Sequence, residues 1–445
     1  MSMDHYYLLG RSGLRVSRLA LGTMNFGTSG FHAPYGKTED EARAVFRRYL
    51  DAGGNFIDTA DFYTADQSET ILGGLIAEAG VRDRVVLTTK FTNSVNPGDP
   101  NAGGNGRKTM IAAVDASLRR LRTDYIDLFL LHTWDRITPV EEVVRTLDDL
   151  ARAGKIRYAG LSDVPAWYTA RAQTLADAHS LAPMVSLQLP YSLIERSIEV
   201  EHVPAAQLLG LGITAWSPLG GGFLTGKYRN EGQGLSGDGR LSISGTSSTT
   251  WTERHWELLN TLRTVADGLG VTMAQVALNW VATRPGVASA IVGASSADQL
   301  GASLAALDFE LPAELRSALD EASAVPPASV YRMFTPEYQS WLVSPGVKVG
   351  DKPAGYHPAV QNWLRHPAVA LTPGTPPRRP ELVTAPGGWP SGGRVEPGCR
   401  GAAGTTAGRL SPDGGPAGSP TTLPPAGPGR LARCQRLAWP PRPAR

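Results

Sequence analysis

The chain has 445 residues, of which 42% are hydrophobic and 19% charged, and a formal net charge of +2. Such a chain can bury a sizeable core, and its charge implies no gross electrostatic partner. It lacks a run of about 18 apolar residues, which excludes a membrane-spanning helix, and a signal peptide is not expected. Its two cysteines, Cys399 and Cys434, lie near the end. We therefore expect a cytoplasmic protein without a disulfide framework.

The composition changes near residue 370. Residues 371–445 hold 16 Pro, 14 Gly, 10 Arg, no Lys and 3 acidic residues, so their net charge is 10 − 3 = +7 and that of residues 1–370 is 2 − 7 = −5. A segment so rich in Pro and Gly cannot bury enough apolar surface to offset its ordering entropy, which predicts a disordered tail. Arginine without lysine favours a read-through or frameshifted extension with GC-rich codons over a tail that binds nucleic acid.

Before the tail, a predicted hairpin is followed by alternating strands and helices. The hairpin joins residues 6–9 and 14–19 across a turn from Gly10 to Gly13. Thr38 and Glu41 form a predicted capping box for the first helix. The expected strands span residues 19–21, 55–57, 85–89, 126–131, 156–160, 185–187, 213–215 and 287–292. The expected helices span residues 38–51, 68–79, 109–121, 140–153, 166–179, 203–209, 253–269, 273–284 and 297–307.

Eight strand–helix units in about 300 residues match the size of a (β/α)8 barrel. We predict an α/β protein with a TIM barrel over residues 1–330, capped by the N-terminal hairpin. Residues 331–370 are a candidate lining of the substrate pocket, and residues 371–445 form the disordered tail. A doubly wound sheet is the alternative, but its one formal phosphate-loop match, Gly210 to Ala215, precedes a strand instead of following one.

Polar residues stand where three successive strands end, which is where barrels carry their chemistry. Asp58 ends the second strand, Tyr63 lies five residues later in a loop, Lys90 ends the third strand and His132 the fourth. Each has an ordinary explanation alone, such as a helix cap, a solvated lysine or a core histidine. Together they favour one shared site. The eight histidines lack paired-ligand spacing, so no metal is predicted.

These four residues suit proton transfer to a carbonyl group. A nearby ammonium, Lys90, would lower the pKa of Tyr63 and make it a usable proton donor. Asp58 would keep that lysine charged, and a neutral His132 would orient the carbonyl oxygen. Because no side chain delivers hydride, a nicotinamide cofactor is implied.

Residues 5–325 resemble the aldo-keto reductase family. The motifs are Gly22-Thr-Met-Asn-Phe-Gly27, Asp58-Thr-Ala-Asp-Phe-Tyr63, Lys90, Leu130-Leu-His132, Gly160-Leu-Ser-Asp163, Gln188-Leu-Pro-Tyr-Ser-Leu193, Trp216-Ser-Pro-Leu219 and Gly226-Lys-Tyr228. The resemblance implies a catalytic tetrad of Asp58, Tyr63, Lys90 and His132, and NADP(H) bound without a Rossmann fold.

The resemblance also implies cofactor contacts. Ser162, Asp163 and Gln188 would hold the carboxamide, and Trp216 would stack on the nicotinamide unless it is a core aromatic. Ser295 would contact the 2′-phosphate, and Arg240, in a long loop up to Trp251, is a candidate cover for the adenine. The remaining implied contacts are Gly22, Thr23, Met24, Asp58, Ser217, Pro218, Leu219, Gly221, Lys227, Gly293 and Gln299.

Three departures from the family pattern affect these expectations. Asp163 stands where many members have Asn, so it can accept a hydrogen bond from the carboxamide but cannot donate one. Ala302 and Ser303 replace Glu and Asn, and no Arg or Lys lies near Ser295. Fewer groups then face the adenosine, and the preference for NADP over NAD rests on Ser295.

The leading hypothesis is a reductase that converts aldehydes or ketones to alcohols with NADPH, with Tyr63 as general acid. The alternative is a cofactor-sensing binding module, because the family includes potassium-channel β subunits. Phe26, Phe62, Phe91, Trp134 and the segment Tyr331–Trp341 are candidates for an apolar pocket wall, which would suit aromatic or medium-chain carbonyl substrates. The alternative is that these aromatic residues are core packing. The sequence specifies neither the substrate nor an oligomeric state.

Overall fold

The computed structural model describes residues 3, 5–232, 235–244, 251–326, 328–342 and 345. The chain divides into two units, residues 1–374 and 375–445. The predicted disordered tail, residues 371–445, and most of the predicted pocket segment beyond residue 342 lie outside the described residues.

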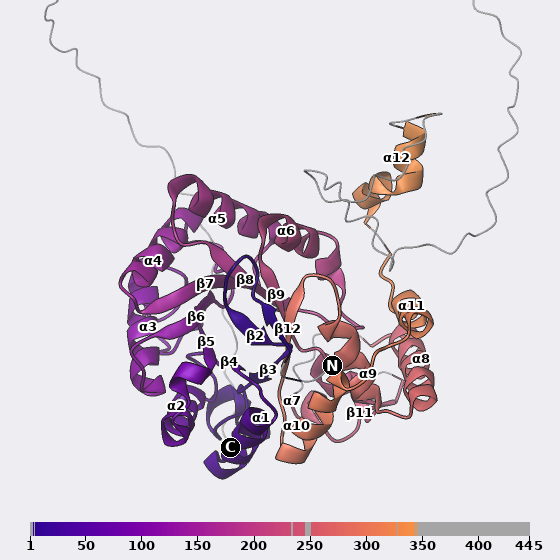
Figure 1. Ribbon diagram of the computed structural model, residues 1–445, viewed down its shortest axis with the longest axis horizontal. Helices are drawn as coiled ribbons and strands as arrows, with labels where there is room; N and C mark the ends of the chain where they lie inside the picture. The colour runs from indigo at the N-terminus through magenta and orange to yellow at the C-terminus, as the bar shows by residue number, and fades with distance from the viewer. Residues whose placement is uncertain are drawn as a thin grey trace, which may run out of the picture. The chain divides into compact units, whose positions relative to one another are not determined.

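Eight parallel strands close into a barrel in the order β12-β3-β4-β5-β6-β7-β8-β9 (Figure 1). This confirms the predicted (β/α)8 barrel. The strands are β3 Leu19–Gly22, β4 Phe56–Asp58, β5 Val86–Phe91, β6 Ile126–Leu131, β7 Ile156–Ser162, β8 Met184–Pro190, β9 Gly212–Trp216 and β12 Val287–Val292. Six of them, β3, β4, β5, β7, β8 and β9, end later than expected. As a result Ser162, Gln188 and Trp216 are strand residues.

Helices surround the barrel and bury their apolar faces on it (Figure 1). The predicted capping box is confirmed, since Thr38 and Glu41 bond reciprocally at the start of α1. The helices are α1 Glu39–Asp51, α2 Gln67–Ala79, α3 Arg107–Leu121, α4 Val140–Arg152, α5 Ala166–His179, α6 His202–Leu209, α8 Glu253–Leu269, α9 Met273–Ala282, α10 Ala297–Leu304 and α11 Ala313–Ala322. Among these, only α11 was not expected from the sequence.

The predicted hairpin is confirmed as β1 Tyr6–Leu8 paired with β2 Arg15–Ser17. At its turn, Gly10 has φ +56°, and a Cβ there would lie 2.5 Å from the carbonyl oxygen of Val185. A glycine is therefore required for the close approach to the start of β8. Leu9 and Val16 join a core cluster inside the barrel. The hairpin thus fills the amino-terminal end and leaves the carboxyl end to the site.

Strand register places the polar residues at that carboxyl end. Side chains two residues apart share a face, so the core residue Phe56 is followed inward by Asp58, and Val86 by Lys90. Asp58 pairs with Gly22 on one side and Thr88 on the other, and Ser162 pairs with Gln188. The barrel interior therefore changes from apolar to polar along its axis.

The long loop after β9 contains structure that the sequence did not indicate. It holds η4 Gly220–Thr225, a small hairpin of β10 Arg229–Asn230 and β11 Leu235–Ser236, and α7 Arg240–Ser244. The α7 turn contacts both η4 and η1 Gly30–Tyr35, a turn after β3 that was also not expected. These elements lie against the loops that carry the candidate site.

The remaining elements are short. They are η2 Arg82–Arg84, η3 Ser197–Glu199, η5 Ala305–Leu307, η6 Ser329–Phe334 and α12 Pro336–Leu342. A buried ion pair fixes α11, because Asp320 accepts bonds from Arg284 at 3.0 and 3.1 Å and from the Trp280 indole at 2.8 Å. Within the described ranges, no helix combines the length and hydropathy needed to cross a membrane.

Candidate active site

Lys90 lies at the centre of the site. Its ammonium donates to Asp58 Oδ1 at 2.6 Å, to the Thr59 carbonyl at 2.8 Å and to Tyr63 Oη at 3.2 Å, which uses all three of its protons. Burial alone would lower the pKa of Lys90, but the Asp58 carboxylate and Tyr63 raise it above its ordinary value. The structure therefore keeps a buried positive charge beside the Tyr63 phenol.

Asp58 is held from several sides. Gln188 Nε2 donates to its Oδ2 at 2.8 Å, so both carboxylate oxygens have partners. Its backbone carbonyl accepts from the N–H of Thr23 at 3.0 Å and from the Thr23 hydroxyl at 3.1 Å. Thr23 is fully buried, and it fixes the strand end that carries Asp58.

The pKa of Tyr63 is raised, whereas the sequence argument expected it to be lowered. Burial raises it, and the nearby Lys90 charge only partly opposes that effect. The sequence argument counted the charge and omitted the desolvation of a side chain that is 9% exposed. Tyr63 is accordingly a neutral phenol at pH 7, and Lys90 is placed to stabilise any phenolate that forms.

His132 follows β6 and is neutral. Burial, and then the charge of Lys90, hold its pKa well below the ordinary value. Asn93 Nδ2 lies 3.3 Å from His132 Nδ1. Because an amide nitrogen only donates, Nδ1 is the acceptor and the proton is assigned to Nε2. The His132 ring lies 5.8 Å from the Tyr63 ring, so the site contains a second neutral donor.

A second histidine, His32 in η1, was not recognised from the sequence. Its ring centroid lies 5.4 Å from that of Tyr63, and its Nδ1 accepts the backbone N–H of Thr64 at 3.2 Å. Burial, helped by the charge of Arg240, lowers the pKa of His32 to about 4. A lone histidine in a Gly- and Pro-containing loop gave no signal, and neither did Asn93.

Ser162, Asp163 and Trp216 lie together at the ends of β7 and β9. The Ser162 hydroxyl is buried and has no partner in the described part of the chain. Asp163 takes a left-handed conformation with φ 46°, and its Oδ1 accepts the Trp216 indole N–H at 3.0 Å. Burial raises the pKa of Asp163 to about 6, although the Trp216 hydrogen bond and the Lys90 charge both act to lower it. Three of the four residues expected at the nicotinamide are thus neighbours.

The residues expected near the cofactor phosphates follow β9. The Ser217 hydroxyl accepts the Gly221 N–H at 3.2 Å, so that backbone donor is used within the turn that also holds Pro218 and Leu219. Among the described residues, the Lys227 ammonium has neither an ion pair nor a hydrogen bond, and it lies 5.3 Å from the Tyr228 ring centroid. The Arg240 guanidinium lies 5.3 Å from the Tyr35 ring centroid, which places it beside η1. Lys227 is therefore a cation available for a phosphate.

The loops after β3 and β12 are joined. Asn25, next to Met24, donates to the Ala294 carbonyl at 2.9 Å, between Gly293 and Ser295. Gln299 accepts the Ser295 N–H at 2.7 Å through its amide oxygen, and Ser296 caps α10. Gly22, at the end of β3, lies on the same side of the barrel. The structure thus brings the expected adenosine-side residues to one helix N-terminus, where an anion is favoured.

The expected apolar wall is only partly present. Phe62 and Trp134 lie near the site, since the Phe62 ring is 5.3 Å from the His132 ring and the Trp134 backbone N–H donates to the Asp163 carbonyl at 3.4 Å. Phe26 and Phe91 are fully buried in the core, so the expectation that they line an accessible pocket is wrong. In the segment Tyr331–Trp341, the Trp341 side chain is 70% exposed, and its part in a pocket stays a prediction.

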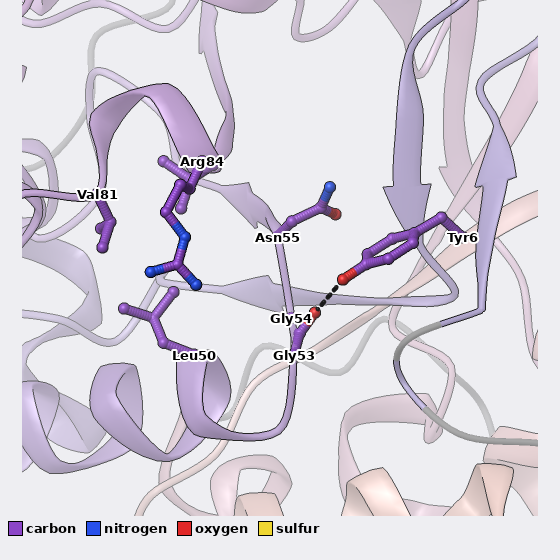
Figure 2. Close-up of a pocket in the computed structure, with 8 residues that line it drawn as sticks. Tyr6, Leu50, Gly53, Gly54, Asn55, Val81 and Arg84 are labelled. Atoms are coloured by element: carbon purple, nitrogen blue, oxygen red, sulfur yellow. Dashed lines mark hydrogen bonds between the residues drawn. The ribbon is translucent and has the colours of Figure 1, made fainter.

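Two surface pockets lie at the other end of the barrel. One has a volume of about 240 Å³ and is lined by residues around Gly53, Asn55 and Arg84, where the Tyr6 hydroxyl donates to the Gly53 carbonyl at 2.9 Å (Figure 2). The other is lined by Arg11, Met184 and their neighbours. Both adjoin strand starts, whereas barrel chemistry lies at strand ends. Neither pocket belongs to the site.

Among the described residues, no group of three or more His, Cys, Asp or Glu could hold a metal.

Comparison with known proteins agrees with this geometry. The sequence model of the Aldo/keto reductase family matches residues 18–324. The chain belongs to the aldo/keto reductase family. The chain is 36% identical to the uncharacterized oxidoreductase YrpG of Bacillus subtilis, over 76% of the chain and 99% of that protein. It is 36% identical to the norsolorinic acid reductase stcV of Emericella nidulans, over 70% of the chain and 79% of that protein.

Another relative carries a different name. A protein of Schizosaccharomyces pombe named as a voltage-gated potassium channel subunit beta is 34% identical, over 71% of this chain and 92% of that protein. The family and the relatives establish this aldo/keto reductase as an oxidoreductase, and the family implies small carbonyl substrates.

Proposed function

We propose that this aldo/keto reductase reduces aldehydes or ketones to alcohols with NADPH, and that Tyr63 is the general acid. The arrangement of Lys90 carries the proposal, because one buried ammonium bonds to both Asp58 and Tyr63. A proton donor that becomes an anion in the reaction is most useful beside a fixed positive charge in a site that excludes water.

The residues at the strand ends fit a nicotinamide dinucleotide. Among the described residues, the buried Ser162 hydroxyl has no hydrogen-bond partner, and such a group normally finds one. Asp163 and Gln188 lie beside it, and Lys227, which has no ion pair among the described residues, offers an ammonium for a phosphate. When bound, NADPH supplies the hydride that goes to the carbonyl carbon.

Each residue of the tetrad then has a defined task. Tyr63 donates its phenolic proton to the carbonyl oxygen, and Lys90 stabilises the resulting phenolate until solvent returns a proton. Asp58 keeps Lys90 charged, since burial alone would lower the pKa of that lysine. His132 donates from Nε2 to the carbonyl oxygen and fixes its position, because Asn93 occupies Nδ1.

The surroundings favour aromatic carbonyl compounds. Phe62, Trp134 and Trp167 lie near His132 or near one another, and aromatic rings pack well against flat substrates. We therefore propose aryl aldehydes and aryl ketones as the first substrates to assay.

The test is Tyr63→Phe, which removes only the transferred proton. General acid catalysis is worth about 10²- to 10⁴-fold, so kcat should fall by that factor while NADPH still quenches tryptophan fluorescence with unchanged affinity. Tyr35→Phe is the matched control, because the Tyr35 ring lies beside Arg240 and the three protons of Lys90 bond to other residues. A Tyr63→Phe protein with normal kcat would show that Tyr63 is not the acid.

The cofactor preference is measured in the same titration. Tight binding of NADPH with weak binding of NADH would support Ser295 as a 2′-phosphate contact. Equal affinities for the two cofactors would assign the site to NAD.

A second candidate function is a cofactor-sensing binding module. The relative named as a potassium channel subunit beta supports it. A module of this kind would hold the cofactor tightly and turn over slowly. Rapid multiple turnover on aryl aldehydes, with fast cofactor exchange, would exclude it.

A further inference from the structure

We propose that the charge of Asp163 selects the redox state of the bound cofactor: its carboxylate favours the positively charged oxidised nicotinamide over the neutral reduced ring. Bound NADPH is then a stronger hydride donor than free NADPH. This inference rests on the proposed function, because it takes the nicotinamide to lie at the ends of β7, β8 and β9.

Asp163 is fixed at the mouth of the barrel. Its backbone N–H donates to the Gln188 carbonyl at 3.2 Å, and its carbonyl accepts the Trp134 N–H at 3.4 Å. Its left-handed conformation, φ 46°, is one that Asp and Asn tolerate better than most residues. The side chain therefore leaves the strand end in one defined direction.

The carboxylate is only partly satisfied. Oδ1 accepts the Trp216 indole N–H at 3.0 Å, and Oδ2 accepts no hydrogen bond from the described residues. The next side chain back along the strand, Ser162, presents a buried hydroxyl that also lacks a partner. Two oxygens from adjacent residues thus lack a hydrogen-bond partner among the described residues, next to an indole that Asp163 anchors.

The negative charge is not neutralised by a salt bridge. Lys90 is the cation whose charge reaches Asp163, but its three protons already bond to Asp58, Thr59 and Tyr63. No ion pair of Asp163 exists among the described residues. An asparagine would accept the same Trp216 bond without placing a charge there. The acid therefore adds a half-buried negative charge that the local hydrogen bonds do not require.

An oxidised nicotinamide would be the missing cation. An opposite charge within about 4–6 Å typically shifts an equilibrium between charged and neutral forms by about 10- to 1000-fold. Linkage makes the effect reciprocal. If the oxidised cofactor favours the ionised form of Asp163 by some factor, the ionised Asp163 raises the affinity for the oxidised cofactor by the same factor. We expect at least about a tenfold effect on the ratio of the two dissociation constants.

The experiment compares full-length wild type with Asp163→Asn. Dissociation constants for NADP⁺ and NADPH are measured at pH 8 by quenching of tryptophan fluorescence. The expected result is that Asp163→Asn weakens NADP⁺ relative to NADPH by about tenfold or more. The matched control is Ser162→Ala, which removes a neutral contact beside the same ring and should weaken both forms equally. An unchanged ratio in Asp163→Asn overturns the inference.

A measurement on wild type alone guards against a variant that fails to fold. The titratable groups around Asp163 are Lys90 and Tyr63, whose pKa values are raised, and His132, whose pKa is well below its usual range; Asp58 is paired with Lys90. Lowering the pH from 8 to 5 should protonate Asp163 and weaken the binding of NADP⁺ in particular. The Kd for NADP⁺ divided by the Kd for NADPH should therefore rise. The 2′-phosphate is common to both forms and cancels. A flat ratio contradicts the inference.

The two proposals fail differently. If wild type binds neither NADP⁺ nor NADPH, and neither NADH nor NAD⁺, the proposed function fails and the Asp163 inference falls with it. If both forms bind and the ratio ignores Asp163, only the inference fails.

Discussion

The ammonium of Lys90 lies 2.6 Å from Oδ1 of Asp58, and the two side chains are 0% and 5% exposed. Neither charge would be stable there alone, because a buried ion without a partner loses its hydration without compensation. The pair is the point at which the stability of the barrel and its chemistry depend on the same atoms.

Lys90→Met should therefore unfold more easily by about 3–5 kcal/mol, since it leaves the Asp58 carboxylate buried and unpaired. Asp58→Asn combined with Lys90→Met should recover most of this loss, because Gln188 can still bond to the amide. Urea unfolding measures both, and the two variants should be equally inactive. A double variant no more stable than Lys90→Met would show that the loss comes from packing instead of charge.

The tautomer of His132 gives a second prediction. Asn93 donates to Nδ1 and keeps the proton on Nε2. In Asn93→Asp the carboxylate would accept from Nδ1, so the proton would leave Nε2 and the donor to the carbonyl oxygen would be lost. We expect kcat to fall by at least about 100-fold. Asn93→Ala, which imposes neither tautomer, should lose less; equal losses would contradict the tautomer argument.

Much of the barrel could be predicted because its signals are local. The Thr38 and Glu41 capping box and the turn at Gly10 depend on neighbours in sequence, and the structure reproduces both. Asp58, Lys90 and His132 could be located because strand ends alone determine which residues share the mouth of a barrel. The site thus followed from counting strands.

The rest depends on long-range contacts. His32 reaches Tyr63 only because η1 folds back over the β4–α2 loop, and nothing around His32 in the sequence indicates that path. The net pKa shift of Tyr63 depends on burial, which a list of neighbouring charges does not contain. Phe26 and Phe91 were misplaced for the same reason, because an aromatic residue in a motif can face the core or the cleft.

A third prediction separates stability from activity. Arg284 bonds to Asp320 and Tyr191, and lies 4.5 Å from the Trp280 ring centroid, in a network away from the tetrad. Arg284→Met should lower the free energy of unfolding by about 3 kcal/mol without changing KM below the unfolding transition. Arg171→Met, which breaks an exposed ion pair with Glu141, should cost no more than about 1 kcal/mol. Equal costs would show that the Arg284 network contributes no more than a surface pair.

The last prediction concerns stability and pH at Asp163. Its pKa is about 6 in the folded protein, because burial disfavours the charge, and about 3.9 in an unfolded chain. Between these values the folded state binds more protons, so rising pH destabilises the fold through this group. Asp163→Asn removes that cost. It should stabilise the cofactor-free protein by about 1–2 kcal/mol at pH 8. This is less than the free energy that corresponds to the full pKa shift, because solvent screens a partly exposed side chain.

The advantage of Asp163→Asn should shrink as the pH falls to 5, where wild-type Asp163 is mostly protonated. Urea unfolding at both pH values measures it, with the exposed Asp308→Asn as the control that should change neither value. A stabilisation independent of pH would mean that it arises from packing of the amide and not from the charge. A site that keeps an acid at a measurable cost in stability, where an amide could make the same bond to Trp216, is consistent with a use for the charge when the cofactor is bound.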